Sequence, residues 1–136
     1  MRALQKFVTG KIADEEFPDF DFIVDATDNP DSKRLVDLKC QEFGKPCCIG
    51  GVRDFSGQVL TLLPADHRFD EIFGEAAQGG VLPCSLGGVA GPAAAFCASL
   101  QSAEVIKYIT GAGEILSGRL FLFNLLKNSF NVLSLV

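Results

Sequence analysis

A run of polar residues that follows a short apolar stretch holds the strongest candidates for chemistry in this sequence. The apolar residues 22–24 lead into Asp-Ala-Thr-Asp-Asn at positions 25–29. A carboxylate at the carboxyl end of a parallel strand lies where α/β sheets bind ligands, and Asp28 could hold Mg²⁺ on a nucleotide because hard cations prefer carboxylate oxygens. Alternatively, these residues only turn the chain and cap a following helix, with Asn29 as the N-cap. The residues alone leave both interpretations open.

Cys84 is the cysteine best placed to act as a nucleophile. It lies in Leu-Pro-Cys-Ser-Leu-Gly-Gly, residues 82–88, just before a long predicted helix. A thiol on a loop near a helix N-terminus ionises more readily and can attack an electrophile. The alternative is a small apolar residue packed under the loop, because free cysteine is usually buried. We expect the other cysteines to pack in the interior: Cys40, Cys47, Cys48 and Cys97.

Three further features could have a chemical role, but each also has a simple structural interpretation. His67 is the single histidine, and a solvated surface position explains it without a catalytic partner. The glycines of residues 87–92 lack the Gly-x-Gly-x-x-Gly and Gly-Lys-Ser/Thr spacings, so we interpret them as a flexible entry to a helix. Gly57 and Gln58 could form a bulge, approach a ligand closely or simply turn the chain.

Alternating strand and helix patterns predict the framework that positions these residues. A helix is expected over residues 30–43, ended by Gly44, and a second over 89–110. The first helix joins two strands, so those strands should pair in parallel. We expect a turn at residues 50–51 and a long connection over 65–87 with little regular structure. Strands are expected over residues 3–8, 22–26, 46–49, 58–63, 120–123 and 132–135, the last two as a hairpin, with at most one helical turn near 11–16.

The helix predicted over residues 89–110 has a polar and an apolar side. The polar side carries Gln101, Glu104, Lys107 and Tyr108. A wide apolar stripe is typical of a helix packed on a sheet, so the apolar side should face the sheet. That side carries Phe96, Ala98, Leu100, Ala103, Val105, Ile106 and Ile109.

The composition fits one globular α/β domain of 136 residues, with 48% hydrophobic and 21% charged residues. The 12 basic and 17 acidic residues, for a net charge of −5, argue against a general nucleic-acid binder and against adhesion to an anionic membrane. No apolar run approaches the ~20 residues that span a bilayer. Five cysteines, with no Cys-x-x-Cys pair and no secretion signal, indicate reduced thiols and a cytoplasmic location.

Several segments, in the right order, resemble motifs of the ThiF/MoeB/HesA family, the E1-like adenylyltransferases that activate ubiquitin-like sulfur carriers. Residues 21–29 are similar to an apolar strand that ends in Asp-x-Thr-Asp-Asn, and Cys84 with residues 88–92 to a cysteine followed by Gly-Val-x-x-Pro. Residues 99–107 are similar to the helix Ser/Thr-Leu-Gln-Ala-x-Glu-Ala-Ile-Lys. The remaining similar segments are 44–46 (Gly-x-Pro), 55–59 (Phe-x-Gly-Gln) and 117–124, a closing strand.

The resemblance implies the C-terminal portion of a ThiF-type nucleotide-binding domain, with three layers around a Rossmann-like mixed sheet. Such proteins bind ATP and Mg²⁺, adenylate the C-terminal glycine of a ThiS- or MoaD-type carrier for thiamine or molybdopterin biosynthesis, and usually form homodimers. Asp28 matches the family's metal and nucleotide aspartate, with Asn29 beside it. Cys84 matches the cysteine that some members use for a thioester or acyl-disulfide step.

The sequence departs from the family pattern in two respects. The glycine-rich nucleotide loop, the ribose-binding acid and the phosphate-binding Arg and Lys do not occur in it. We therefore expect residues 1–136 to form a single partial domain without the N-terminal nucleotide-binding half, inactive by itself. Arg68 and Glu71 stand where many members have the first Cys-x-x-Cys pair, and the second pair does not occur either, so a structural zinc is not expected.

Two alternatives to the adenylyltransferase interpretation stay open. The chain could be a non-catalytic remnant that serves as a dimerisation or carrier-protein docking module. It could also be half of a dinucleotide-binding dehydrogenase, which would explain the parallel unit but neither the motif at 55–59 nor the segment that begins at Cys84.

Overall fold

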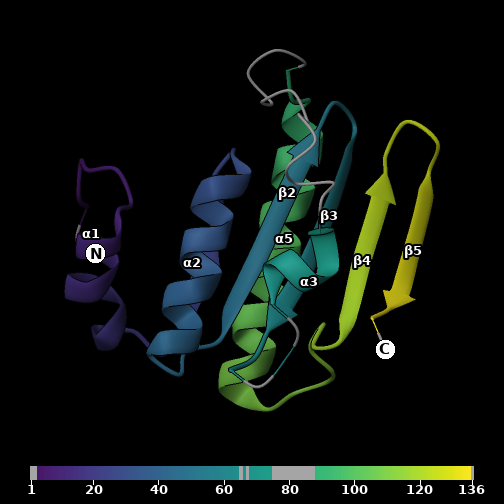
Figure 1. Ribbon diagram of the computed structural model, residues 1–136. Coiled ribbons are helices and arrows are strands. Elements are labelled where there is room, and N and C mark those ends of the chain that lie inside the picture. The colour runs from purple at the N-terminus through teal and green to yellow at the C-terminus, as the bar shows by residue number, and fades with distance from the viewer. Residues whose placement is uncertain (1–2, 65, 67, 75–87, 136) are drawn as a thin grey trace.

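A five-stranded mixed sheet forms the centre of the computed structural model, which describes residues 3–64, 66, 68–74 and 88–135 (Figure 1). The strand order is β1-β2-β3-β4-β5. The parallel pairing predicted for the strands around the first helix is confirmed, since β1 pairs in parallel with β2. The other neighbouring strands are antiparallel. The strands are β1 (Ile23–Asp25), β2 (Cys47–Arg53), β3 (Ser56–Leu62), β4 (Arg119–Asn124) and β5 (Ser129–Ser134).

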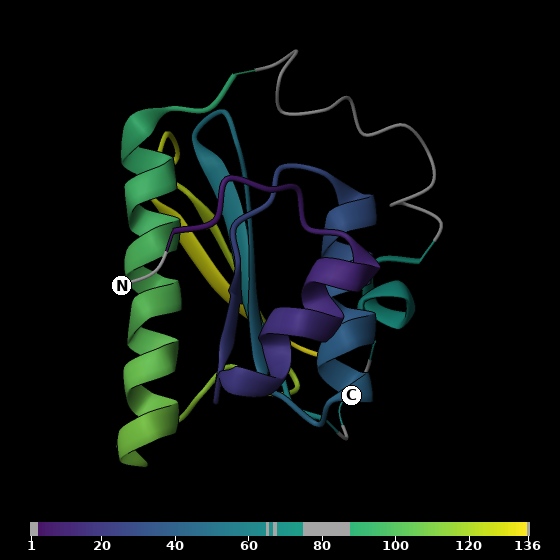
Figure 2. The same cartoon turned by 90° about the vertical axis from the view of Figure 1, so that its left-hand side faces the viewer.

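Helices cover both faces of the sheet, as Figure 2 shows edge-on. The helices α1 (Gly10–Glu16), α2 (Pro30–Glu42) and α3 (Phe69–Phe73) lie on one face, and α5 (Gly91–Thr110) lies on the other. Successive strand residues point to opposite faces. Cys47 and Ile49 therefore join the apolar cluster under α2, whereas Cys48 joins the cluster under α5. The predicted three-layer α/β architecture is confirmed.

The sequence signals at both ends of α2 act as predicted. The Asn29 side chain accepts a hydrogen bond from the Ser32 backbone N–H at 2.8 Å, which satisfies one of the free donors of the first turn. Pro30 occupies the first turn, where a missing N–H costs nothing. Gly44 follows the helix with a φ of +62°, a conformation that glycine adopts without strain.

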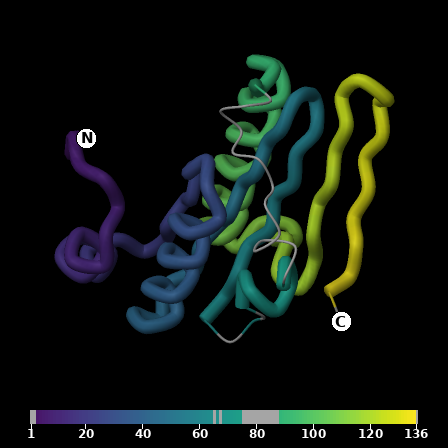
Figure 3. Tube along the Cα trace, turned by 45° about the horizontal axis from the view of Figure 1, so that its top comes forward, coloured from purple at the N-terminus to yellow at the C-terminus, as the bar shows by residue number. Residues whose placement is uncertain are grey.

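The prediction of a strand over residues 3–8 is wrong, because residues 3–9 form no strand or helix. Regular structure begins with α1, which spans about two turns where at most one was predicted near residues 11–16. The Thr9 hydroxyl accepts a hydrogen bond from the Ile12 N–H at 3.3 Å. Figure 3 shows this N-terminal segment on the opposite side of the molecule from the predicted hairpin, β4 and β5. Sequence pattern suggested a strand there, but no neighbouring strand pairs with it.

The turn predicted at residues 50–51 is also wrong, because β2 continues to Arg53 and turns at residues 54–55. Gly50 serves close packing, since a Cβ there would lie 2.7 Å from the Gln101 amide and 2.8 Å from Cys97 Sγ. Gly57 has a similar role within β3, where a Cβ would collide with the Phe123 ring. The close approach considered for Gly57 is thus an approach to a side chain of the core.

Part of the predicted orientation of α5 is confirmed, since Phe96 and Leu100 pack against the apolar cluster under this helix. The rest of the prediction is wrong. The buried residues of α5 are Ala93, Cys97, Gln101 and Glu104. Ile106 and Ile109 are 61% and 68% exposed. The polar groups of Gln101 and Glu104 face the sheet because they satisfy backbone and hydroxyl groups there, as buried polar groups require.

The connection over residues 65–87 contains the short helix α3, which the sequence analysis did not predict. Phe69, its first residue, is buried in the cluster under α2. Its backbone N–H donates a hydrogen bond to Asp37 Oδ2 of α2 at 2.9 Å. Asp37 Oδ1 is buried and has no hydrogen-bond partner among the described residues. Burial raises the pKa of Asp37, and the hydrogen bond from Phe69 lowers it by less.

We predict that Asp37→Asn stabilises the protein at neutral pH by roughly 1 kcal/mol, because it removes a buried charge and keeps an acceptor for Phe69. Because the pKa of Asp37 is raised in the folded protein, the ionised carboxylate is less favourable to the fold than the protonated one, and this penalty is largest at pH values above that pKa. The gain should therefore vanish at about pH 3 and below, where Asp37 is protonated in both the folded and the unfolded protein, and grow as the pH rises. Urea unfolding across this range measures it, with the exposed Asp31→Asn as the control. A gain that does not depend on pH would contradict the explanation.

None of the helices in the described ranges has the length and apolar character that crossing a membrane requires.

Candidate functional site

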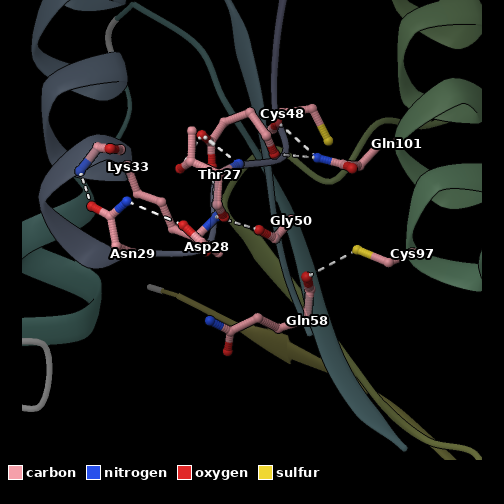
Figure 4. Close-up of polar contacts among 11 residues, drawn as sticks. Thr27, Asp28, Asn29, Lys33, Cys48, Gly50, Gln58, Cys97 and Gln101 are labelled. Atoms are coloured by element: carbon pink, nitrogen blue, oxygen red, sulfur yellow. Dashed lines mark hydrogen bonds and ion pairs between the residues drawn. The ribbon is translucent and has the colours of Figure 1, made fainter. Parts of the chain in front are cut away.

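Asp28 lies just beyond the carboxyl end of β1, beside the parallel strand β2, which continues to Arg53 (Figure 4). Its side chain is exposed, in the loop that joins β1 to α2. Asp28 Oδ1 accepts a hydrogen bond from Asn29 Nδ2 at 3.3 Å, and within the described part of the chain Oδ2 has no partner. A carboxylate with a free oxygen therefore stands at the position where α/β sheets bind ligands.

The capping of α2 does not use Asp28. Asn29 caps the helix through its own Oδ1, and no hydrogen bond joins the Asp28 carboxylate to the first turn of α2. The alternative that the polar run only turns the chain and caps the helix thus accounts for Asn29. It leaves Oδ2 of Asp28 without a partner among the described residues.

A buried ion pair lies directly beneath this loop. Lys33 Nζ is 2.7 Å from Asp25 Oδ2, and it also donates to the carbonyl oxygens of Thr27 at 2.7 Å and Gly50 at 2.5 Å. Asp25 is 1% exposed and Lys33 is 8% exposed. Asp25 Oδ1 accepts hydrogen bonds from the Thr27 N–H at 3.2 Å and the Thr27 hydroxyl at 2.7 Å. We call these four residues, Asp25, Thr27, Lys33 and Gly50, the Lys33 node.

The sequence analysis missed Lys33, although a signal for it exists. Lys33 begins the row of buried residues on α2 that continues with Val36, Asp37 and Cys40, a spacing that places residues on one helix face. A lysine on the buried face of a helix needs an acceptor, and Asp25 ends the preceding strand. Together these two facts would have indicated an ion pair at the strand end.

Gln101 connects α5, on the opposite face of the sheet, to β1 and β2 near the Lys33 node. Its Nε2 donates to the carbonyl oxygens of Asp25 at 2.8 Å and Cys48 at 3.1 Å, so α5 holds β1 and β2 together (Figure 4). Gln101 is 4% exposed. The sequence analysis quoted Gln101 within a family motif but placed it on the outer side of the helix.

Three of the described thiols are poor nucleophiles, because their pKa values are raised. Burial raises the pKa of Cys48 to about 12 and also raises the pKa of Cys97. The Cys40 thiol and burial together raise the pKa of Cys47 well above its ordinary value. Cys40, Cys47, Cys48 and Cys97 are free and buried, which confirms their predicted interior positions. Cys84 and His67 lie outside the described residues.

The residues at this edge suit a cation that a nucleotide brings with it. No group of three or more His, Cys, Asp or Glu side chains among the described residues could hold a metal ion by itself. Magnesium in nucleotide sites is held by one or two carboxylates together with phosphates and water. The single free carboxylate of Asp28 fits that arrangement.

Known proteins resemble this chain in sequence and in fold. A family model described as the ThiF family matches residues 1–135. The chain is 34% identical over 127 residues to a probable adenylyltransferase/sulfurtransferase MoeZ of Mycobacterium tuberculosis, and it covers 32% of that protein. It is 33% identical over 134 residues to a sulfur carrier protein adenylyltransferase of Thermus thermophilus, and it covers 49% of that protein. The matches take in 88% and 93% of this chain, so the chain spans at most about half the length of these relatives.

A solved structure supports the fold. The crystal structure of E. coli MccB with MccA matches 95% of this chain and 40% of that chain, with a TM-score of 0.74 and 14% sequence identity. The TM-score shows a shared fold, and at 14% identity the likeness shows the fold alone.

Proposed function

This chain belongs to the ThiF family, and from that membership we propose that it is part of an ATP-dependent adenylyltransferase that activates the C-terminus of a ubiquitin-like sulfur carrier protein. The name of the Thermus thermophilus relative supports this activity. The observation that carries the proposal is the exposed Asp28 carboxylate just beyond the carboxyl end of β1, with Oδ2 unpaired among the described residues. The Lys33 node supports that loop from below.

In this proposal Asp28 holds Mg²⁺ on the bound ATP, and Asn29 fixes the adjoining end of α2. The cation would screen the negative charge of the triphosphate while the carrier's C-terminal carboxylate attacks the α-phosphorus and pyrophosphate leaves. A structure of MccB contains ATP, which supports nucleotide binding by this fold. Asp25 does not compete for the cation, because the Lys33 node occupies both of its oxygens.

We further propose that residues 1–136 supply one part of the nucleotide site, because no glycine-rich nucleotide loop occurs among them. Cys84 would act after adenylation: its thiolate would attack the carbonyl carbon of the carrier's adenylated C-terminus, a thioester would form, and AMP would leave. The partner would be a carrier of the ThiS or MoaD type, and the assembly a homodimer. The free thiols of the described residues suit a reducing compartment such as the cytoplasm.

A chimaera tests this proposal directly. The segment of the Thermus thermophilus relative that this chain matches would be replaced by residues 1–136, and carrier-dependent exchange of pyrophosphate into ATP would be measured. We expect exchange by the chimaera and none by the 136-residue chain alone. A chimaera that unfolds cooperatively but shows no exchange, beside an active Thermus parent, would contradict the proposal.

A docking module without catalysis is the second candidate, and exposed apolar residues on the edge strand β5 favour it. Phe130 and Val132, which share one face of β5, are about half exposed, as is Leu133 on the other face. Exposed apolar residues often mark interaction sites. Binding of the carrier by an inactive chimaera would support this alternative. Exchange activity in the chimaera would exclude it.

A further inference from the structure

The Lys33 ammonium lies at the edge of the sheet where a triphosphate would bind, yet its hydrogen bonds are all made inside the protein. An ammonium group has three donors. Lys33 Nζ donates to Asp25 Oδ2, the Thr27 carbonyl oxygen and the Gly50 carbonyl oxygen, which belong to β1, the loop and β2. The group therefore has no donor left for a ligand, and its role must be exerted through the residues that it holds.

The contact with Thr27 is the one that bears on Asp28. The Thr27 carbonyl belongs to the planar peptide unit that joins Thr27 to Asp28, so Lys33 sets the orientation of the backbone just before Asp28. Asp25 Oδ1 holds the preceding peptide unit through the Thr27 N–H. On the other side, Asn29 is fixed by its hydrogen bond from Ser32. Asp28 is thus held from both sides while its own carboxylate stays exposed.

The buried position of the node makes this arrangement rigid. Lys33 and Asp25 are 8% and 1% exposed, and charge-assisted hydrogen bonds away from water are stronger than neutral ones. Gly50 lies in the interior of β2, and Gln101 fixes the Asp25 carbonyl oxygen from α5. The loop is therefore tied to the most firmly packed part of the sheet.

We propose that Lys33 is a positioning residue, which holds the loop before α2 so that the Asp28 carboxylate points toward the nucleotide-bound cation. That Lys33 holds the loop follows from its contacts in this chain. That this helps Asp28 to bind the cation rests on the proposed function. Misplacing a binding group by about 1 Å can cost on the order of 100-fold in rate.

The first test uses backbone ¹⁵N relaxation of the 136-residue chain and needs no ligand. Lys33→Met alone would leave Asp25 buried without its counter-charge and could unfold the protein. The informative variant is therefore Asp25→Asn with Lys33→Met, which keeps the side-chain oxygen that binds Thr27 and removes both charges. Lys39→Met is the matched control, because Lys39 lies on the same helix and pairs with Asp14 and Glu42.

We expect the order parameters of Thr27 and Asp28 to fall from about 0.85 to below about 0.6 in the double variant. The order parameters of Val59 and Leu60, which are buried in β3, should stay unchanged in the double variant. In Lys39→Met the order parameters of all four residues should stay unchanged. A general loss of stability would not single out the loop. An ordered loop in the folded double variant would overturn the proposal.

The second test uses the chimaera and ATP–pyrophosphate exchange. The double substitution is expected to raise the KM for MgATP at least about 10-fold and to leave the KM for the carrier unchanged. A smaller folded fraction would lower the exchange rate without raising either KM. An unchanged KM for MgATP would overturn the positioning role. If the chimaera with the unsubstituted segment showed no exchange, the proposed function would fail instead, and the order parameters would still decide whether Lys33 holds the loop.

Discussion

Replacing Asp28 by asparagine is expected to lower ATP–pyrophosphate exchange by the chimaera at least about 100-fold, the size of loss that follows removal of one group that stabilises developing charge. Asparagine keeps the shape of the side chain but lacks the negative charge that attracts a divalent cation. Asp28 is exposed, and its one hydrogen bond is with its neighbour Asn29, so the fold should tolerate the change.

The design of this experiment separates chemistry from folding. Urea unfolding of Asp28→Asn in the 136-residue chain should differ from the unsubstituted protein by less than about 0.5 kcal/mol, as for most surface changes. Asp31→Asn, which removes an exposed carboxylate from the first turn of α2, is the activity control and should retain full exchange. Equal rates for Asp28→Asn and the unsubstituted chimaera would mean that Asp28 has no part in the reaction.

The largest expected effect on stability comes from Glu104. This residue is 2% exposed, and its Oε2 accepts hydrogen bonds from the Thr61 hydroxyl and the Leu116 N–H, both at 2.6 Å. Its other oxygen pairs with Lys107. One side chain thus ties α5 to β3 and to the segment that leads into β4.

We predict that Glu104→Ala lowers the free energy of unfolding by about 3 kcal/mol or more, because a buried hydroxyl and a backbone N–H lose their acceptor and a cavity opens. The midpoint of urea unfolding measures this loss. Ser102→Ala, an exposed change on the same helix, should alter stability by less than about 0.5 kcal/mol. A Glu104→Ala protein as stable as the Ser102→Ala protein would show that the buried carboxylate has no net stabilising role.

Local patterns predicted much of the fold because the interactions behind them are local. The cap at Asn29, the glycine that follows α2 and the apolar residues of β1 act over a few positions of the chain, so their types reveal the elements directly. The parallel pairing of β1 and β2 followed from the helix between them. The location of Asp28 at the carboxyl end of β1 was therefore predictable.

The failures share a different physical origin. Hydrophobicity predicted that Ile106 and Ile109 face the sheet, but specific acceptors for Gln101 and Glu104 exist only where the sheet is assembled. The pair Gly50 and Gly51 was interpreted as a turn, because glycine is common in turns. In the structure the space that Gly50 leaves is filled by Gln101 and Cys97.

The amino-acid sequence by itself determined the order of most elements, the parallel pair of strands and the place of the Asp28 loop, because periodicity and caps are properties of neighbouring residues. Only the tertiary structure decided which side of α5 is buried and how the loop is held. Lys33, Thr27 and Gly50 meet through contacts between separate segments, and a buried charge finds its partners only when those segments are packed together.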